Sequence, residues 1–370
     1  MISTLLFLLA TVTLGDSPQE SDAQGLAAVL AEERARIQLI KKISPAVVCL
    51  FPKDTMAGGG SGVLIDADGI GVTNFHVVAP TLATRQASGG LSDHKKYDVE
   101  VLGIDPHGDL AMFRLVKSGA TPHVEIGDSD ALAVGDQCLA LGNPFLLADD
   151  FTPTVTFGII SGLHRYQWGT GHALNYTDCI QVDTSINPGN SGGPLFDMNG
   201  KLIGINGRVS IEERGRVNVG VGYAITTSQI QRFIPALRAG LVTPHAASGF
   251  TVIDAGGGCI VNQILEDSAA YRAGLRLNDR VQRFGGVDVR SANHFASLLG
   301  TYPAGWPVEI VFRHDQSILK SVVRMDALPL PAPRKSPHGR KTFDPFAPTS
   351  ETRAANRRAV RRAIDLYAKS

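Results

Sequence analysis

The chain has 370 residues, 44% of them hydrophobic and 6% aromatic, which allows two folded domains with substantial cores. Its 35 basic and 35 acidic residues give a net charge of zero. The charge balance of the whole chain therefore points to neither a nucleic-acid nor a membrane partner.

Residues 1–15 contain the apolar run Leu5–Ala10, followed by the small-x-small pattern of Thr13-Leu14-Gly15. A run this short is typical of a secretory signal peptide, not of a membrane-spanning helix. No Lys or Arg precedes it, and a buried N-terminal helix is the alternative. Because the polar residues Asp16–Gln24 follow at once, we expect an exported protein of the periplasm or cell envelope.

Residues 16–42 are predicted to form a linker and an amphipathic helix. Apolar residues recur at helical spacing from Leu26 to Ile43, with charged residues between them, and Pro45 ends the pattern.

From Ala46 onward the pattern changes to short β runs separated by turns. Many short strands with frequent turn signals indicate an all-β barrel architecture. The predicted strands are residues 46–51, 61–65, 97–102, 110–115, 137–141, 154–163 and 220–225.

Two side chains in this region are suited to acid–base chemistry. His76 ends a β-branched run, and Asp109 directly precedes the apolar residues Leu110 and Ala111. A buried aspartate can hold one imidazole nitrogen, so that the other nitrogen accepts a proton from a serine.

The glycine-rich stretch Asn187–Pro194 carries that serine, Ser191. A serine attacks only when a base takes its proton and hydrogen-bond donors stabilise the resulting oxyanion. Gly189 permits a tight turn that points two backbone N–H groups at one spot, so we assign the oxyanion hole to Gly189, Asn190 and Ser191. Alone, the stretch is equally typical of a surface loop.

The spacing Gly189-x-Ser191-x-Gly193 also fits the nucleophile elbow of α/β-hydrolases. That motif needs a helix directly after the serine, with the acid and the histidine further downstream. Here two glycines and the turn signal Asp197–Gly200 follow the serine, and the chain order is His, Asp, Ser. We reject the elbow.

Four ordered segments resemble the HtrA family of trypsin-like serine proteases, over a region from about Ile43 to Ile234. These segments are Thr73–Val78, Asp109–Ala111, Gly142–Phe145 and Asn187–Pro194. The resemblance implies a mainly β protein with a chymotrypsin-like double six-stranded β-barrel in residues 43–240. It also implies that His76 is the general base, Asp109 its orienting acid and Ser191 the nucleophile, meeting between the barrels.

In the resembled family the N-terminal region helps to assemble trimers, so we expect a homotrimer or a higher oligomer. The predicted helix could instead pack on its own domain.

The resemblance also places a substrate pocket at Ser185, Ile186, Asn206, Gly207 and Arg208. Position 185 carries no carboxylate to select a basic side chain, and Ile186 would make the pocket narrow and apolar. We predict cleavage after small aliphatic residues, unless Arg208 points into the pocket.

The long stretch Leu146–Asn175 includes the polar segment Trp168–Gly171. The resemblance implies that part of it responds to the PDZ region or to ligand and orders the oxyanion loop, while a passive surface loop is the alternative. His164 and Arg165 are interpreted as solvated loop residues and not as metal or phosphate ligands.

Thr227–Ala239 predicts a helix capped by Ser or Thr, closed by Gly240 and kinked or interrupted at Pro235. After the linker Leu241–Ala247, residues 246–328 alternate strands and short helices. Ala273-Gly274-Leu275, with Asp279 and Val281, resembles an α+β PDZ domain.

PDZ domains bind a peptide C-terminus as an added strand and hold its carboxylate with backbone N–H groups. Our candidate for this peptide-binding segment is Gly249, Phe250, Thr251 and Val252. A PDZ domain retained only as a regulatory spacer is the alternative.

Cys49, Cys138, Cys179 and Cys259 each lie in or beside an apolar run, without the spacing of a metal site. We interpret them as core residues, although a disulfide between Cys138 and Cys179 is conceivable. We predict neither a metal nor a cofactor.

Residues 329–370 change character again, to a proline-rich linker and then a basic tail. This segment has 10 Lys or Arg against 3 Asp or Glu. The tail could contact an anionic membrane surface or nucleic acid, but a solvated tail explains it equally well, and we predict no nucleic-acid partner.

Two functions remain open at this point. The first is a serine endopeptidase that hydrolyses misfolded or unfolded proteins through an acyl-enzyme, without ATP because no Walker-type loop is present. The second is a PDZ-bearing chaperone or scaffold with little proteolytic activity. The three catalytic residue types favour the first.

Overall fold

The computed structural model describes residues 18–53, 59–117, 119–143, 150–167, 176–187, 189–211 and 218–330. The chain divides into two compact units, Met1–Lys42 and Ile43–Ser370. The predicted signal peptide and the basic tail lie outside the described residues.

The first unit carries helix α1 (Pro18–Ile43), which begins earlier than the predicted start at Leu26. The polar residues that we assigned to a linker are helical instead. Proline is tolerated at the first helical position because its missing N–H has no helical acceptor there.

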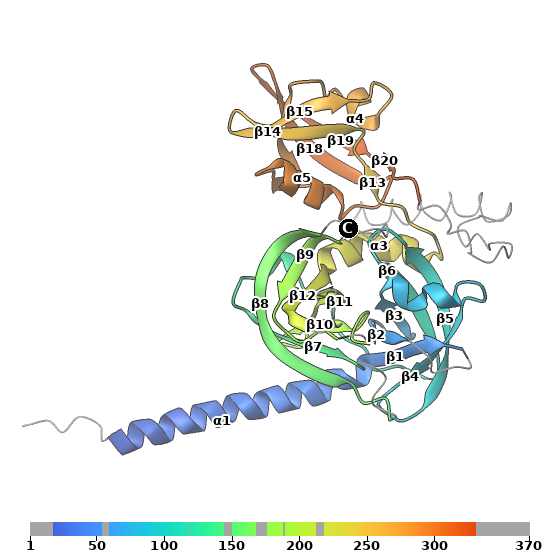
Figure 1. Ribbon diagram of the computed structural model, residues 1–370, viewed down its shortest axis with the longest axis vertical. Helices are drawn as coiled ribbons and strands as arrows, with labels where there is room; N and C mark the ends of the chain where they lie inside the picture. The colour runs from blue at the N-terminus through green and yellow to red at the C-terminus, as the bar shows by residue number, and fades with distance from the viewer. Residues whose placement is uncertain are drawn as a thin grey trace, which may run out of the picture. The chain divides into compact units, whose positions relative to one another are not determined.

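The first barrel closes in the strand order β1-β2-β3-β6-β5-β4, and every neighbouring pair is antiparallel (Figure 1). Its short helical turns are η1 (Ser44–Ala46), α2 (Phe75–Val78) and η2 (Ala79–Thr81). Its strands are β1 (Val47–Pro52), β2 (Gly60–Leu64), β3 (Ile70–Thr73), β4 (Gln86–Gly90), β5 (Lys96–Asp105) and β6 (Leu110–Val116).

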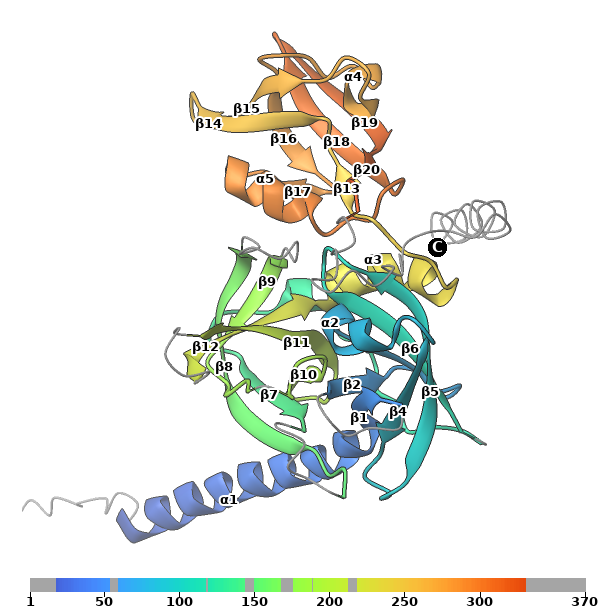
Figure 2. The ribbon, with the colours of Figure 1, turned by 45° about the vertical axis from the view of Figure 1, so that its right-hand side comes forward.

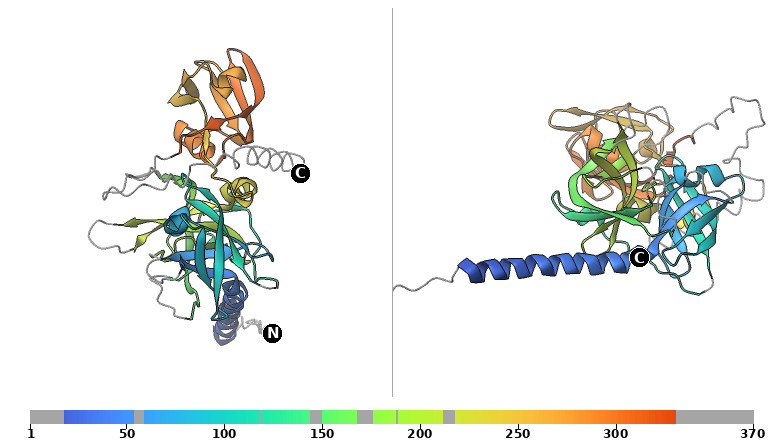
Figure 3. Two further views of the ribbon diagram at one scale, coloured as in Figure 1. Left: turned by 90° about the vertical axis from the view of Figure 1, so that its right-hand side faces the viewer. Right: turned by 60° about the horizontal axis from the view of Figure 1, so that its bottom comes forward.

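The second barrel closes in the order β10-β11-β12-β9-β8-β7 and lies beside the first (Figure 3). The two closed six-stranded barrels confirm the predicted fold class. The strands are β7 (Gln137–Gly142), β8 (Thr154–Gln167), β9 (Tyr176–Val182), β10 (Pro194–Asp197), β11 (Leu202–Ile211) and β12 (Asn218–Thr226), with η3 (Ser129–Ala131) before β7.

Helix α3 (Thr227–Arg238) follows the second barrel, and the side chain of Thr226 caps it by accepting from the N–H of Gln229. This confirms the predicted cap. Of the predicted kink or interruption at Pro235, the interruption is wrong, because the helix runs through this residue, and the kink stays a prediction. A proline this close to the C-terminal end removes only one backbone donor, and little helix remains beyond it to break.

The C-terminal domain is built on a sheet of order β14-β15-β16-β18-β19, with β17 paired to β16 and a separate β13-β20 pair. Helix α5 (Ala292–Leu299) packs on β14 and β16 (Figure 2). The other elements are β13 (Ala246–Ala247), β14 (Phe250–Ala255), β15 (Gly258–Ile264), α4 (Ala269–Arg272), β16 (Arg280–Phe284), β17 (Val287–Asp288), β18 (Pro307–His314), β19 (Ser317–Arg324) and β20 (Asp326–Ala327).

Phe113 on β6 fills the centre of the first barrel and is fully buried. A Cβ atom on Gly71 would lie 2.3 Å from its ring, and one on Gly62 would lie 2.7 Å from it. The two glycines therefore leave the space that the ring occupies.

We expect Phe113→Ala to lower the free energy of unfolding of the protease region by about 3–5 kcal/mol, because it removes a buried ring and leaves a cavity. Val116→Ala, on the same strand at a side chain that is 56% exposed, is the matched control. Urea denaturation followed by near-UV circular dichroism measures both, and equal effects would contradict this account of the core.

Candidate active site

His76 and Asp109 meet because of two local backbone features. His76 lies in the single turn of α2, directly after β3, and Asp109 has a left-handed backbone (φ 57°) just before β6. The N–H of Phe75 donates to the backbone oxygen of Asp109 (3.0 Å), and the N–H of His76 donates to Oδ1 (2.9 Å). Backbone N–H groups thus hold the His76 turn against Asp109, in addition to the contact between the two side chains.

The imidazole of His76 is held by the same carboxylate. Nδ1 lies 2.8 Å from Oδ2 and 3.0 Å from Oδ1 of Asp109. The Asp109 side chain is fully buried, while that of His76 is 41% exposed. This contact leaves Nε2 to accept a proton when Nδ1 carries the hydrogen.

The pKa of His76 is raised above its ordinary value. Burial lowers the pKa, but the negative charge of Asp109 and its hydrogen bond to the ring together outweigh burial. The imidazole is therefore a stronger base than a free histidine.

A second, fully buried His–Asp pair supports the turn before Asp109. Oδ1 of Asp105 accepts the N–H groups of His107 (3.1 Å) and Gly108 (2.9 Å), and its Oδ2 lies 2.7 Å from Nε2 of His245. His245 Nδ1 lies 2.6 Å from the backbone oxygen of Gly300. This pair was not predicted from the sequence, because His245 lies in the segment that we interpreted as a plain linker.

The Ser191 turn is fixed against the first barrel by Ser61 on β2. The hydroxyl of Ser61 donates to the oxygen of Gly189 (2.7 Å), and its N–H donates to the oxygen of Ser191 (2.9 Å). Gly189 and Gly192 have φ values of 105° and 83°. A Cβ atom on Gly192 would lie 2.2 Å from the oxygen of Ser61, so the close approach requires glycine here.

This turn leaves backbone donors available. Within the described part of the chain, the N–H groups of Gly189 and Ser191 donate no hydrogen bond, whereas that of Asn190 donates to the oxygen of Asn187 (2.9 Å). The N–H groups of Gly189 and Ser191 are thus the donors suited to an oxyanion.

The Ser191 hydroxyl donates to the backbone oxygen of Gly207 on β11 (3.1 Å). Among the hydrogen bonds of the described residues, none joins Ser191 to His76. A backbone oxygen opposite the serine therefore competes with the imidazole for the hydroxyl proton.

The residues of the predicted substrate pocket have different surroundings. Ser185 is exposed, whereas Ile186 is fully buried in the core of the second barrel. Asn206 is also buried, and its side-chain amide donates to the oxygen of Pro194 (2.9 Å). The side chain of Arg208 lies outside the described residues, so the cleavage preference stays a prediction.

The predicted peptide-binding segment of the C-terminal domain borders a cavity of about 600 Å³, which is lined by β14 and α5 and also by the protease-region residues His107, Tyr166 and Thr177. Gly249, Phe250 and Thr251 line it, opposite Ala296 and Leu299 of α5. Val252 does not line it and packs against the domain core, to which Phe250 also belongs.

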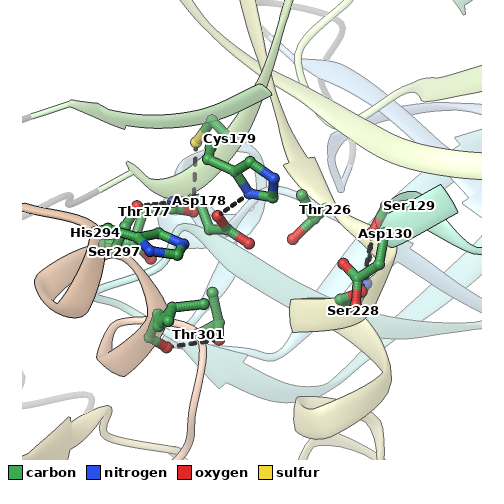
Figure 4. Close-up of polar contacts among 12 residues, drawn as sticks. Ser129, Asp130, Thr177, Asp178, Cys179, Thr226, Ser228, His294, Ser297 and Thr301 are labelled. Atoms are coloured by element: carbon green, nitrogen blue, oxygen red, sulfur yellow. Dashed lines mark hydrogen bonds and ion pairs between the residues drawn. The ribbon is translucent and has the colours of Figure 1, made fainter. Parts of the chain in front are cut away.

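The β8–β9 hairpin contacts the same helix. The N–H of Asp178 donates to Oγ of Ser297 on α5 (2.9 Å), and these residues lie together in Figure 4. Asp178 also lies 2.8 Å from Nδ1 of His164, so His164 and this carboxylate form an ion pair when the ring is protonated. Trp168–Asn175, part of the predicted sensor loop, lies outside the described residues.

Comparison with known proteins matches residues 60–205 to the trypsin-like peptidase domain. The periplasmic serine endoprotease DegP of Escherichia coli K12 is 36% identical over 259 residues, covering 66% of this chain and 52% of DegP. A probable periplasmic DegP-like serine endoprotease of Chlamydia pneumoniae is 38% identical over 261 residues, covering 67% of this chain and 51% of that protein.

Solved structures of serine proteases are also similar to this chain. The HtrA-type protease AlgW with tripeptide is 29% identical with a TM-score of 0.62, covering 80% of this chain and 98% of that one. The serine endoprotease from Yersinia pestis is 26% identical with a TM-score of 0.53 and covers the same shares. The chain belongs to the HtrA family of serine proteases.

This HtrA chain spans about half the length of the curated relatives that it matches, 52% of DegP. Among the helices that the structure describes, none combines the length and the apolar character needed to cross a bilayer.

All four cysteines of this HtrA protein are buried free thiols. The conceivable disulfide between Cys138 and Cys179 is therefore not formed, because both side chains serve as barrel core. Burial raises the pKa of Cys49 to about 11 and that of Cys138 to about 12, so these thiols are protonated at neutral pH.

We expect kcat/KM of this HtrA protein to rise with pH through an apparent pKa above about 6.5, the ordinary histidine value. An imidazole accepts a proton only in its neutral form, and the raised pKa of His76 moves that form to higher pH. Asp109→Asn should lower kcat about 10³–10⁴-fold and move the acid limb to lower pH, because the negative charge is lost.

Asp178→Asn, which alters the His–Asp pair on the β8–β9 hairpin, is the matched control. Hydrolysis of a fluorogenic peptide from pH 5 to 9 measures both variants. An acid limb that Asp109→Asn leaves in place would contradict the assignment of His76 and Asp109.

Proposed function

We propose that this chain is a serine endopeptidase that cleaves unfolded or misfolded proteins through a triad of His76, Asp109 and Ser191. The observation that carries the proposal is the buried Asp109 carboxylate, which binds both the backbone and the ring of His76 beside the Ser191 turn. The relatives named as serine endoproteases support it.

In the proposed reaction, Nε2 of His76 takes the hydroxyl proton while Oγ of Ser191 attacks the peptide carbonyl. The N–H groups of Gly189 and Ser191 stabilise the oxyanion, and the protonated His76 then gives its proton to the leaving amine. Water, deprotonated by His76, hydrolyses the acyl-enzyme and frees the serine. For this cycle the Ser191 hydroxyl must turn from Gly207 towards His76, a rotation about one side-chain bond.

The contact of Ser191 with the oxygen of Gly207 also favours a second candidate, a peptide-binding chaperone or scaffold with little proteolysis. A serine whose proton stays on a backbone oxygen is not activated. The two candidates differ in whether the hydroxyl reacts.

We further propose a periplasmic location, supported by the relatives that are named periplasmic and by the apolar run at Leu5–Ala10. Assembly into trimers or larger oligomers and contact of the basic tail with an anionic membrane also remain proposals.

We expect Ser191→Ala to abolish cleavage of unfolded casein and labelling by a fluorophosphonate, because both need the nucleophile. Ser321→Ala, on β19 of the C-terminal domain, is the control and should behave as wild type. Wild-type protein that is folded but neither labelled nor active would favour the chaperone. Mapping the casein cleavage sites tests the preference for small aliphatic residues, which a majority of cuts after Lys or Arg would overturn.

We also propose that the C-terminal domain binds peptide C-termini along β14, as a PDZ domain does. In the described sheet β14 is an edge strand, paired on one side with β15, and the apolar residues Phe250, Ile264 and Leu299 line the adjoining cavity. An added peptide strand would fit between β14 and α5.

A fluorescent decapeptide ending in phenylalanine should therefore bind about tenfold more tightly than its C-terminal amide, because the carboxylate gains charge-assisted hydrogen bonds. Ala296→Phe should block binding by filling the cavity, and Asn293→Phe, at an exposed site on the same helix, should not. Fluorescence anisotropy measures each affinity. Equal affinity for acid and amide would support the spacer alternative.

A further inference from the structure

The carboxylate of Asp109 has a partner outside the proposed triad. The hydroxyl of Tyr176 donates a hydrogen bond to Oδ2 of Asp109. Tyr176 is the first residue of β9 and is 3% exposed. The second barrel thus directly contacts Asp109, the carboxylate that orients His76.

This hydrogen bond adds a donor to the buried carboxylate of Asp109. Oδ1 of Asp109 accepts the N–H of His76 and lies 3.0 Å from its Nδ1, while Oδ2 lies 2.8 Å from Nδ1 and accepts from Tyr176. A carboxylate has about four lone-pair sites, and a buried one is costly when it is left unsatisfied. The Tyr176 hydroxyl occupies a lone-pair position on Oδ2 of Asp109 that His76 does not use.

Gly207 makes room for this tyrosine. A Cβ atom at position 207 would lie 2.4 Å from the Tyr176 hydroxyl and 2.5 Å from the ring carbon Cε1. Any side chain at this position would displace the hydroxyl from Asp109. The backbone oxygen of the same glycine accepts the Ser191 hydroxyl, so Gly207 neighbours both Ser191 and Tyr176.

We propose that Tyr176 is a positioning residue for catalysis, which fixes the Asp109 carboxylate and offsets part of its negative charge at the imidazole of His76. This inference rests on the proposed peptidase function. Without the hydroxyl, the carboxylate rotates more freely, and His76 spends less time with Nε2 directed at the serine.

The direction of the electrostatic effect follows from the groups around Asp109. The hydrogen bonds of the described residues bring two ionisable side chains to this carboxylate, His76 from α2 and Tyr176 from β9. Removing the hydroxyl dipole leaves the full negative charge facing the ring, which stabilises the protonated imidazole. The pKa of His76 should then rise further.

The first experiment is Tyr176→Phe in the full chain, which keeps the ring and removes only the hydroxyl. We expect kcat to fall about tenfold with KM nearly unchanged, since the tyrosine acts through Asp109 and not on the substrate. The acid limb of kcat/KM should move to higher pH by about half a unit.

Tyr97→Phe is the matched control, because the Tyr97 hydroxyl donates to Oδ2 of Asp93 (2.6 Å) at an exposed site on the first barrel. Kinetic constants and an acid limb that match wild type in Tyr176→Phe would overturn the proposal. A fall in kcat that only tracks the loss of folded protein, with the acid limb in place, would overturn it equally.

The second experiment does not depend on activity. In a Ser191→Ala background, NMR titration of ¹⁵N-labelled histidines gives the pKa of His76 directly, with the signal assigned by its absence in His76→Ala. Tyr176→Phe should raise this pKa, and so should Gly207→Ala, which displaces the hydroxyl. An unchanged pKa in both variants would refute the role of Tyr176.

The two experiments separate this inference from the proposed function. If the wild-type protein does not cleave casein but the His76 pKa responds to Tyr176→Phe, the peptidase proposal fails and the positioning contact stands. If the wild-type protein cleaves casein and the pKa does not respond, only the positioning role fails.

Discussion

The buried charge of Asp109 is the constraint on which the site depends. A carboxylate removed from water is stable only when its oxygens are fully hydrogen-bonded, and this one is held by the backbone and ring of His76 and by Tyr176. These partners come from both barrels. The hydrogen bonds to this one charge therefore join the two barrels, as the bonds of Ser61 to the Ser191 turn also do.

The barrel fold and the residues of the candidate site were predictable from the sequence, because each has a local signature. Short β runs separated by turn signals predicted strands such as β6, and glycines around Ser191 predicted a tight turn. Strand β4 was missed, since Gln-Ala-Ser-Gly-Gly lacks β-branched residues and pairs only because its neighbours do. The helical start of α1 was missed because its polar residues read as a linker.

The supporting contacts of the site could not be predicted, because they join residues distant in the chain. Tyr176 follows a long loop and gives no sign in the sequence that its hydroxyl reaches Asp109. His245 likewise looks like a linker residue, yet it connects Asp105 with Gly300 of the C-terminal domain. The segment Leu241–Thr243 is bound to β5 through Ile104, so the connection between the domains is packed and not free.

The four buried thiols have a consequence for biogenesis. Since none of them is paired, the native state contains no disulfide bond that an oxidant must supply. Thiols held protonated inside a core are also poor targets for oxidants and for mixed disulfides. The described fold therefore needs no disulfide-forming enzyme, whether the surrounding compartment is oxidising or reducing.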